Sequence, residues 1–401
     1  MATAIRKIGV LTGGGDCPGL NAVLRAITKT AISEYGMEVI GFLDGFKGMT
    51  ENNYKILDIP SVSGILHTGG TILGSSNRDN PFYFACKTES GVEFADLSDQ
   101  ALDNIKSLGI EALIVIGGDG SLHIAQDFAD KGLPVVGVPK TIDNDLAATD
   151  FTFGFYTAVN TATAALDKLH TTAESHHRIM ILEVMGRYAG WIALHSGVAG
   201  GADVILIPEI PYRVENVLEK IKQRNLHGKK FSLIVVAEGA ASENGEFTVK
   251  ELGANSYAPV RLGGAGQKLA GELAKISDLE IRVTVLGHLQ RGGTPIPYDR
   301  ILATRYGVAA VRLVAGRQFG NMVSLQGPQV NFVPLGQAIE KIKQVDPQGD
   351  FVQDARDIGI SFGACHERHG SEVRRQAGGQ PRELWLCLRA ASAGRGAGAV
   401  R

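Results

Sequence analysis

The chain has 401 residues, 44% of them hydrophobic and 20% charged, which is enough for two domains of ordinary size. A formal net charge of −2 gives no sign of nucleic-acid or anionic-membrane binding, so any anion-binding arginines must be local. We expect no membrane span, because no apolar run approaches ~20 residues, and no secretory signal, because the start MATAIRKIGVLT runs straight into a predicted strand. The cysteines are too few and scattered for a disulfide framework, which makes the cytosol the default: Cys17, Cys86, Cys365 and Cys387.

Short apolar runs alternate with helical patterns along the chain. Runs without polar alternation are typical of strands covered on both faces, and they lie at 8–11, 38–43, 112–117, 134–138, 178–184, 203–208, 231–239 and 282–288. Segments 155–170 and 261–275 have the i, i+3, i+4 spacing of helices. This order predicts a layered α/β fold with mainly parallel sheets. Such folds bind ligands at the carboxyl ends of their strands.

Two glycine-rich turns follow predicted strands. In LTGGGDCPGLN, 11–21, three glycines would let backbone amides approach a ligand, and a helix starting near Leu20 would point its positive end there. A tight strand-to-helix turn explains this motif equally well. In GGDGS, 117–121, Asp119 offers an oxygen ligand for Mg²⁺ and Ser121 could cap the next helix. The second turn favours a phosphate–Mg²⁺ site over a capped turn.

The segment PKTIDND, 139–145, places two carboxylates one residue apart at a strand end. On a pleated backbone Thr141, Asp143 and Asp145 would line one side, and Lys140, Ile142 and Asn144 the other. Two like charges side by side repel each other unless a metal or a proton donor stands between them.

Three further predicted strands also end in polar residues. EVMGR ends in Arg187, AEG contains Glu238, and LGHLQRGG places His288 and Arg291 before a glycine pair. Singly, each has a simple alternative: a solvated arginine, a capping acid or a satisfied histidine. Together with the glycine turns and the carboxylates, they favour a phosphorylated substrate.

In their order and spacing, the motifs GVLTGGGDCPGLNA, GGDGS, PKTIDND, EVMGR and LGHLQRGG resemble the 6-phosphofructokinase family. The match is to its bacterial branch, in which ATP-using and pyrophosphate-using enzymes are mixed, and it covers roughly residues 5–363. The resemblance implies two similar layered α/β lobes with the active site in the cleft between them. The expected lobes are 1–154 plus 291–345 for the phosphoryl donor, and 155–290 plus 346–363 for fructose 6-phosphate. Residues 364–401 form a tail rich in Arg, Gly and Ala, which we expect to be poorly ordered or non-native, with a basic interaction tail as the alternative.

The resemblance also implies residue roles. Asp143 would be the base for the sugar 1-hydroxyl, and Thr141 and Asp145 would orient the reacting groups. Asp119 would bind Mg²⁺. The implied donor contacts are Gly15, Arg78, Gly118, Asp119, Gly120 and Ser121. The implied fructose 6-phosphate contacts are Thr141, Asp143, Met185, Gly186, Arg187, Glu238, His288 and Arg291, with Arg178 and Arg282 reaching in from a neighbouring subunit.

The chain departs from the family pattern where the donor binds. Asn77 stands where ATP-using relatives place an arginine, and Arg78 follows one residue later, which on an extended chain reverses the side-chain direction. Gly120 is typical of ATP users, whereas Lys140 is typical of pyrophosphate users. Because a side chain at position 120 would obstruct ATP sterically and glycine has none, we expect ATP to be the phosphoryl donor. The whole expectation is a cytosolic, homo-oligomeric, Mg²⁺-dependent 6-phosphofructokinase that binds neither nucleic acid nor membranes. The alternatives are a pyrophosphate-dependent enzyme and, from another class, a non-catalytic sugar-phosphate or nucleotide sensor.

Overall fold

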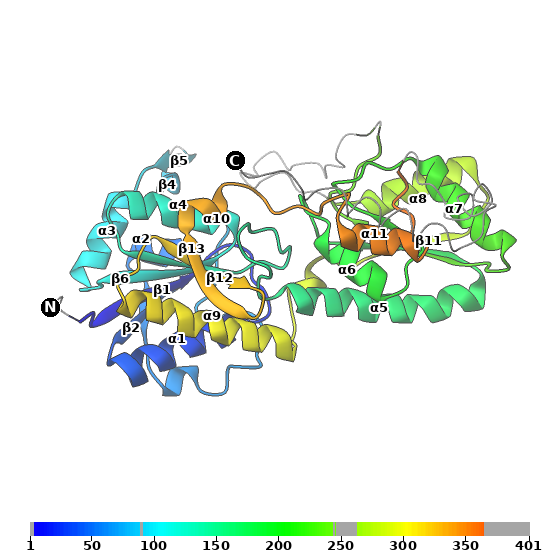
Figure 1. Cartoon of the computed structure of the whole chain (residues 1–401). Coiled ribbons are helices and arrows are strands. Elements are labelled where there is room, and N and C mark those ends of the chain that lie inside the picture. The colour runs from blue at the N-terminus through cyan, green and yellow to red at the C-terminus, as the bar shows by residue number, and fades with distance from the viewer. Residues whose placement is uncertain (1–3, 89–90, 244, 246–262, 365–401) are drawn as a thin grey trace, which may run out of the picture.

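Two α/β lobes, each built around its own sheet, make up the part of the chain that the computed structural model describes, residues 4–88, 91–243, 245 and 263–364 (Figure 1). The large sheet has the order β13 (Gln329–Pro334), β12 (Asn321–Gln326), β7 (Val135–Pro139), β6 (Ala112–Gly117), β1 (Lys7–Thr12), β2 (Glu38–Phe42) and β3 (Tyr54–Leu57). Its two edge strands, β13 and β3, are antiparallel to their neighbours, and the other pairs are parallel. A separate hairpin joins β4 (Phe84–Thr88) and β5 (Gly91–Ala95).

The small sheet is entirely parallel, in the order β11 (Ile281–Val285), β8 (Ile179–Val184), β10 (Ser232–Ala237) and β9 (Val204–Leu206). Its β9 edge is covered by the end of the described chain, since Ser361 pairs in parallel with Val204. Two layered α/β lobes with mainly parallel sheets therefore confirm the predicted fold class, although the two sheets differ in size.

Helices cover both faces of the large sheet (Figure 1). One face carries α1 (Leu20–Tyr35) and α9 (Pro297–Ala315), and the other carries α2 (Phe46–Glu51), α3 (Ser98–Ser107), α4 (Asp119–Asp130) and α10 (Leu335–Ile339). The strands are apolar throughout because their alternate side chains enter different cores. In β6, Ile114 and Ile116 join the first core, and Leu113 and Val115 the second.

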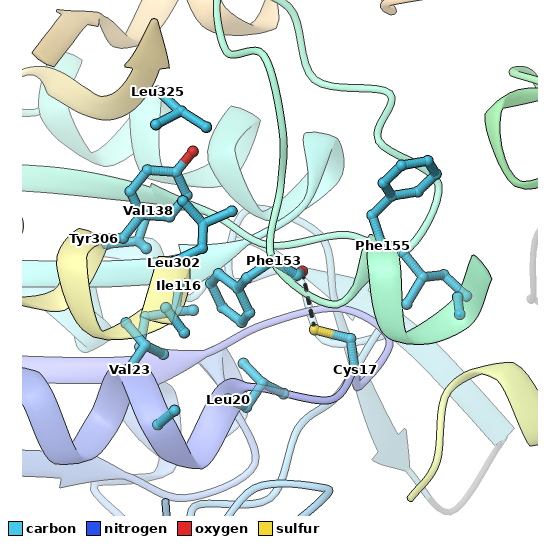
Figure 2. Packing of buried hydrophobic residues seen from close by; sticks show 14 of the residues in the cluster. Cys17, Leu20, Val23, Ile116, Val138, Phe153, Phe155, Leu302, Tyr306 and Leu325 are labelled. Carbon is cyan, nitrogen blue, oxygen red and sulfur yellow. Dashed lines mark hydrogen bonds between the residues drawn. The ribbon is translucent and has the colours of Figure 1, made fainter. Parts of the chain in front are cut away.

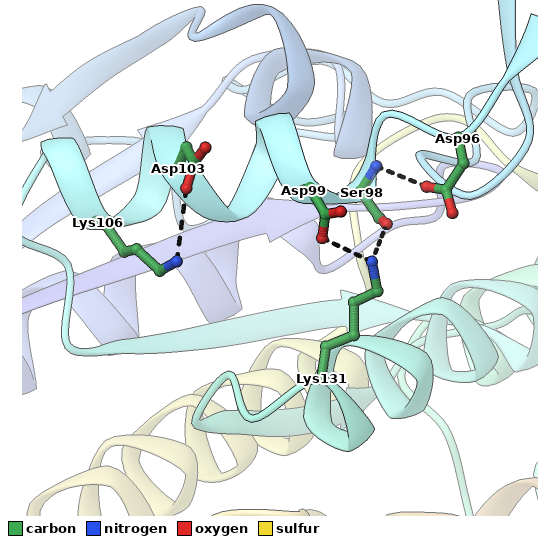
Figure 3. Close-up of polar contacts among 6 residues, drawn as sticks. All are labelled: Asp96, Ser98, Asp99, Asp103, Lys106 and Lys131. Atoms are coloured by element: carbon green, nitrogen blue, oxygen red, sulfur yellow. Dashed lines mark hydrogen bonds and ion pairs between the residues drawn. The ribbon is translucent and has the colours of Figure 1, made fainter.

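Polar contacts join α3 to the end of α4 (Figure 3). Lys131, directly after α4, donates to Ser98 Oγ at 2.6 Å and to Asp99 Oδ1 at 2.8 Å. The Asp96 carboxylate accepts the Ser98 N–H at 2.9 Å, which satisfies a backbone donor at the start of α3. These bonds hold α3 and α4 side by side on one face of the sheet.

The small sheet is also a central layer. Helices α5 (Phe155–His176) and α6 (Trp191–Ala199) pack on one face, and α7 (Val214–Leu226) and α8 (Ala265–Ile276) on the other. Helix α11 (Asp350–Asp357) joins the α5–α6 side.

One core cluster extends from the large lobe into the small one, since it includes both Leu20 and Leu182. Figure 2 shows part of it, where Cys17 lies beside Phe153 and donates to its carbonyl oxygen at 3.6 Å. Burial raises the pKa of this thiol to about 12. Cys17 and Cys86 are free, and Cys365 and Cys387 lie outside the described residues.

All eight predicted strands form, at their predicted places within a residue or two at most ends. The strand β11 differs in being half-exposed, because it is the edge of the small sheet. Of the two predicted helices, the first runs on to His176 and the described part of the second is α8. No helix in the described ranges is long and apolar enough to cross a membrane.

Candidate active site

The loops that follow β1 and β6 meet at the centre of the large sheet. From β1 the chain continues to β2 on one side, whereas β6 lies on the other side, so the loops at these carboxyl ends diverge and leave a crevice. The segment around Ser75 and Ser76 closes over the first loop: Gly14 N–H donates to the Ser76 carbonyl at 2.9 Å, and Ser75 Oγ donates to the Gly14 carbonyl at 2.5 Å.

A cavity of about 460 Å³ lies in this crevice. All six predicted donor-binding residues line it: Gly15, Arg78, Gly118, Asp119, Gly120 and Ser121. Asn77, Lys140, Thr141 and Arg291 line it as well. Asn77 and Arg78 thus both reach the cavity, so the shift of one residue does not take Arg78 away from it.

Gly120 faces open space, whereas other glycines here are tightly enclosed. A Cβ added at Gly120 would meet nothing within 4 Å, but one at Gly13 would lie 2.6 Å from Ser121 Oγ, and one at Gly15 would lie 2.7 Å from Arg291 Nη1. A side chain at position 120 would therefore extend from the first turn of α4 without displacing protein atoms.

Ser121 does not cap α4, so that prediction is wrong. The helix begins at Asp119 after the N-cap residue Gly118, with no side-chain cap, and Ser121 is the third residue of the helix. Its buried hydroxyl faces the close-packed Gly13, and it lines the cavity. The Asp119 carboxylate lies 3.5 Å from His123 Nδ1 and is partly exposed.

The segment after β7 departs from a pleated strand. The strand ends at Pro139, and Asn144 adopts a positive φ of 52°. Burial still alternates as predicted, with Ile142 and Asn144 buried and the threonine and both aspartates half-buried. Lys140, expected on the opposite side, instead donates its ammonium to the Gly15 carbonyl at 2.5 Å and lines the cavity, because its long side chain reaches the loop after β1.

The two carboxylates of this segment are held in an unusual electrostatic environment. Burial and the neighbouring Asp145 raise the pKa of Asp143 to about 7, while Arg291 and Lys140 oppose that shift. Burial likewise raises the pKa of Asp145. Oδ1 of each aspartate is buried without a hydrogen-bond partner among the described residues. Carboxylates kept in this state are typical of sites that exchange protons or bind a charged ligand.

A second cavity, of about 470 Å³, adjoins the first. Met185 and His288, from the loops after β8 and β11, line it together with Asp16. Arg291 lines both cavities, and its Nη1 donates to the Asp16 carbonyl at 3.3 Å. The Arg291 guanidinium therefore lies at the boundary between the first cavity, in the large lobe, and the second cavity, whose lining includes small-lobe residues.

Gly186, Arg187 and Glu238 lie at the carboxyl ends of β8 and β10 but line neither of these two cavities. Gly186 has a φ of 135°, and the Arg187 guanidinium lies 4.9 Å from the ring centre of Tyr188. The negative charge of Glu238 contributes to the raised pKa of Asp143.

Arg178 and Arg282 are not brought to the cavities of their own chain. They lie at the amino ends of β8 and β11, whereas the cavities lie toward the carboxyl ends of these strands. Both pair with Glu280, Arg178 at 2.8 Å and Arg282 at 2.6 Å. This position keeps both arginines away from the cavities of their own chain and is compatible with the predicted role in a neighbouring subunit.

The side chains of the first cavity suit Mg²⁺ only when a bound ligand supplies further oxygen atoms. No group of three or more His, Cys, Asp or Glu side chains in the described ranges could hold a metal ion. The Asp119 carboxylate lines the first cavity, and Mg²⁺ is commonly bound by one or two carboxylates plus substrate phosphates. The residues present therefore fit a phosphate-bound Mg²⁺.

Several lining residues escaped the sequence reasoning. Asp16, Thr71 and Ser75 line the second cavity, and buried Gln290 accepts the Met185 N–H at 3.3 Å. Gln290 lies inside the motif LGHLQRGG, where a glutamine beside a predicted strand end was a usable signal. Thr71 and Ser75 lie in the motif GGTILGS, 69–75, but only the tertiary fold brings Thr71 to Thr12, 3.2 Å away between the hydroxyl oxygens.

This geometry defines the class of protein: an α/β enzyme with a cavity suited to phosphate groups, at the point in the sheet between β1 and β6 where the chain connections diverge. Residues 7–314 match the family described as Phosphofructokinase. The chain belongs to the phosphofructokinase family, and it is a phosphotransferase with an alcohol group as acceptor.

Curated relatives of two kinds are similar to the chain over most of its length. An ATP-dependent 6-phosphofructokinase 2 of Clostridium perfringens is 58% identical over 364 residues, covering 90% of this chain and 100% of the relative. A pyrophosphate–fructose 6-phosphate 1-phosphotransferase of Streptomyces coelicolor is 51% identical over 358 residues, covering 89% and 100%. Among solved structures, phosphofructokinase from Pichia pastoris in the T-state aligns with a TM-score of 0.72 at 31% identity, over 92% of this chain and 38% of that chain.

Proposed function

We propose that the chain is an ATP-dependent 6-phosphofructokinase, which transfers a phosphoryl group to the 1-hydroxyl of fructose 6-phosphate. The observation that carries the proposal is the pair of adjoining cavities that share Arg291. In-line phosphoryl transfer requires the attacking hydroxyl and the leaving oxygen on opposite sides of the transferred phosphoryl group, with a cation beside that group to stabilise its negative charge. The large lobe holds the donor, and the small lobe contributes most of the sugar-phosphate contacts.

Asp143 is the proposed base. With a pKa of about 7, it is poised to accept a proton near neutral pH and is a stronger base than an ordinary carboxylate. Thr141 holds this loop by accepting the Asp143 N–H at 3.1 Å, and Asp145 shapes the field around it. The intact pair of carboxylates argues against a non-catalytic sensor.

Asp119 is the residue that would hold Mg²⁺ against the donor phosphates. When bound, the ion would neutralise phosphate charge in the transition state. The backbone amides at the start of α4, after Gly118, add the positive end of a helix dipole to the same cavity.

The proposed sugar-phosphate contacts are Met185, Gly186, Arg187, Glu238 and His288, joined by Arg178 and Arg282 of a second subunit. A homo-oligomer with shared active sites is therefore part of the proposal. A cytoplasmic location is proposed as well.

Pyrophosphate is the second candidate donor, and one observation favours it. Lys140 is fully inside the structure, with 3% exposure, and its ammonium reaches the donor cavity. A cation there attracts any phosphate, however, including those of ATP. The open space at Gly120 leaves room for the remainder of a nucleotide, so ATP is preferred.

A donor-dependence assay tests the proposal. Formation of fructose 1,6-bisphosphate is measured at fixed fructose 6-phosphate and Mg²⁺, with ATP in one series and pyrophosphate in the other. We expect turnover with ATP and little with pyrophosphate. Turnover with pyrophosphate alone would make the chain the other kind of phosphofructokinase, and no bisphosphate with either donor would favour the sensor.

A further inference from the structure

A segment far from both cavities in the sequence joins the two loops that carry the proposed chemistry. Residues 340–349 cross from α10 in the large lobe to α11 in the small lobe (Figure 1). We call them the connecting segment. No sequence motif singles them out, and they line neither of the two cavities of the proposed site.

On the large-lobe side, the connecting segment pairs with the loop that carries the carboxylates. Lys343 N–H donates to the main-chain carbonyl of Asp145 at 2.8 Å, and Ile342 forms an antiparallel bridge with Leu146. The Lys343 ammonium continues along the same loop and donates to the carbonyls of Thr149 at 3.0 Å and Asp150 at 2.5 Å. Three donors of one residue therefore fix the backbone that leaves Asp145.

On the small-lobe side, the same residue holds the end of the sugar-side loop. Trp191 Nε1–H, at the start of α6, donates to the Lys343 carbonyl at 2.9 Å. The neighbouring Gln344 side chain donates to the Tyr188 carbonyl at 2.9 Å. The Lys343 ammonium also lies 5.4 Å from the Trp191 ring centre, close enough for a cation–π attraction.

A half-buried carboxylate completes this attachment. Glu209 Oε1 accepts the N–H of Val345, in the connecting segment, at 2.8 Å and the N–H of Gly190 at 2.9 Å. Gly190 precedes α6, so Glu209 ties the start of that helix to the connecting segment. The loop between β8 and α6, which begins with Met185, is thereby anchored at its far end.

From these contacts we infer that Lys343 and Trp191 are positioning residues, which set the Asp143–Asp145 loop in register with the Met185–Gly190 loop. The inference rests on the proposed function of those two loops. Neither residue touches the cavities that would hold the reactants, so they act through the backbone of Asp145 and of α6. A displacement of about 1 Å between reacting groups can cost ~10²-fold in rate, which makes such a support functionally important.

The test separates positioning from simple stabilisation. Lys343→Met removes the ammonium donor but keeps the stem, Lys343→Arg restores a donor, and Trp191→Phe removes the indole N–H but keeps a ring. The control is Lys220→Met, because Lys220 also donates its ammonium to a main-chain carbonyl, that of Gly359 at 2.6 Å, on the outer side of the small lobe. Turnover, KM for fructose 6-phosphate and melting temperature are measured for each.

We expect Lys343→Met and Trp191→Phe each to lower kcat by ~10-fold or more with KM changed less than ~3-fold, because the misaligned groups still bind the sugar phosphate. Lys343→Arg should recover most of the loss, and Lys220→Met should stay within ~2-fold of the wild type. The double variant should lose less than the product of the single losses, because both act through Lys343.

Two outcomes would overturn the inference, and they differ from each other. If the wild type is active but Lys343→Met and Trp191→Phe keep its kcat, the segment is only a structural link, even if melting temperatures fall. A wild type inactive on fructose 6-phosphate with both donors overturns the proposed function, and this inference with it.

Discussion

Asp143 concentrates the chemistry of the site in one half-buried carboxylate with a pKa near neutrality. Asp143→Asn removes the base while keeping the shape, so we expect kcat to fall by ~10²–10⁴ with KM for fructose 6-phosphate nearly unchanged. Steady-state kinetics with saturating ATP measure this. A loss of less than ~10-fold would assign the proton to another group.

The same substitution should change how stability depends on pH. The pKa of Asp143 is about 7 in the folded chain, against an ordinary value of 3.8, so folding strengthens its proton binding. Stability from this group is fully present below the ordinary pKa and is lost as pH rises through about 7. Because asparagine cannot ionise, Asp143→Asn should raise the melting temperature of the ligand-free protein more at pH 8 than at pH 5. An equal gain at both pH values would contradict the raised pKa.

Gly120 offers a clean test of the donor. An added side chain there meets no protein atom within 4 Å, so Gly120→Asp should fold normally but place a negative charge where a nucleotide phosphate would lie. We expect ATP-driven turnover to be lost. Gly271→Asp is the matched control, because Gly271 also lies in a helix and faces open space. Retained ATP use by Gly120→Asp would move the donor elsewhere in the cavity.

At the scale of residues, the sequence located the site through its strand ends and missed what the tertiary fold adds. The glycine turns and PKTIDND were visible because parallel strands deliver their carboxyl ends to one edge. The path of Lys140 was not, since it depends on a contact with Gly15, distant in the sequence. Lys343 and Trp191 carry no motif, because their side chains donate to main-chain carbonyls, and any residue type can supply such an acceptor.

Among the elements, the end of the described chain is a structural part of the small lobe. Ser361 pairs beside β9, Phe362 is fully buried, and Ala364 accepts a hydrogen bond from Asn216 at 2.7 Å. The predicted tail was 364–401; its first residue, Ala364, belongs to this structural part, and the rest lies outside the described residues.

Two truncations should therefore behave differently. Deleting residues 366–401 should leave activity and melting temperature unchanged, because that sequence lacks the periodicity of a docked helix or strand. Deleting 361–401 uncovers β9 and removes Phe362, and should lower the melting temperature by more than ~5 °C. Thermal melts of both proteins check this, and equal stability would show that the β9 edge needs no cover.

Burial explains part of which elements could be predicted, but the buried interior strand β12 was also missed, because polar residues interrupt its sequence NMVSLQ. Strands β1, β6, β7, β8 and β10 lie inside their sheets, and their unbroken apolar runs stood out. The antiparallel edges β3 and β13 were missed, because most of their side chains face solvent and the sequences YKIL and QVNFVP mix polar with apolar residues. Edge strands carry less of the hydrophobic pattern on which such predictions depend.

For the whole molecule, the sugar-phosphate role proposed for Arg178 and Arg282 requires an assembly. Each lies at the amino end of its strand, away from the cavities, so a sugar-phosphate role requires a second copy of the chain. We expect Arg178→Ala to raise KM for fructose 6-phosphate far more than KM for the donor. Mixing Arg178→Ala with Asp143→Asn subunits, exchanged by reversible dissociation, should then restore activity, since some hybrid sites combine Asp143 of one chain with Arg178 of the other.

Arg291 provides the control for that experiment. It acts on Asp143 of the same chain, so mixing Arg291→Ala with Asp143→Asn leaves every site with one defect and should restore nothing. Recovery in both mixtures would indicate that the observed activity does not depend on shared sites. Recovery in neither, with hybrids demonstrated by mass, would place each active site within one chain.

The strand order of the large sheet also determines when the sheet can be finished during synthesis. Strand β7 ends at Pro139, but its partner β12 begins only at Asn321, after all four strands of the small sheet have been made. During synthesis, the β7 edge therefore stays unpaired, and α1 stays without its packing partner α9, until the last third of the described chain has emerged from the ribosome. Unpaired edges recruit other chains, so the rate of translation through the small lobe, rather than final stability, should govern how much of this protein is lost to aggregation.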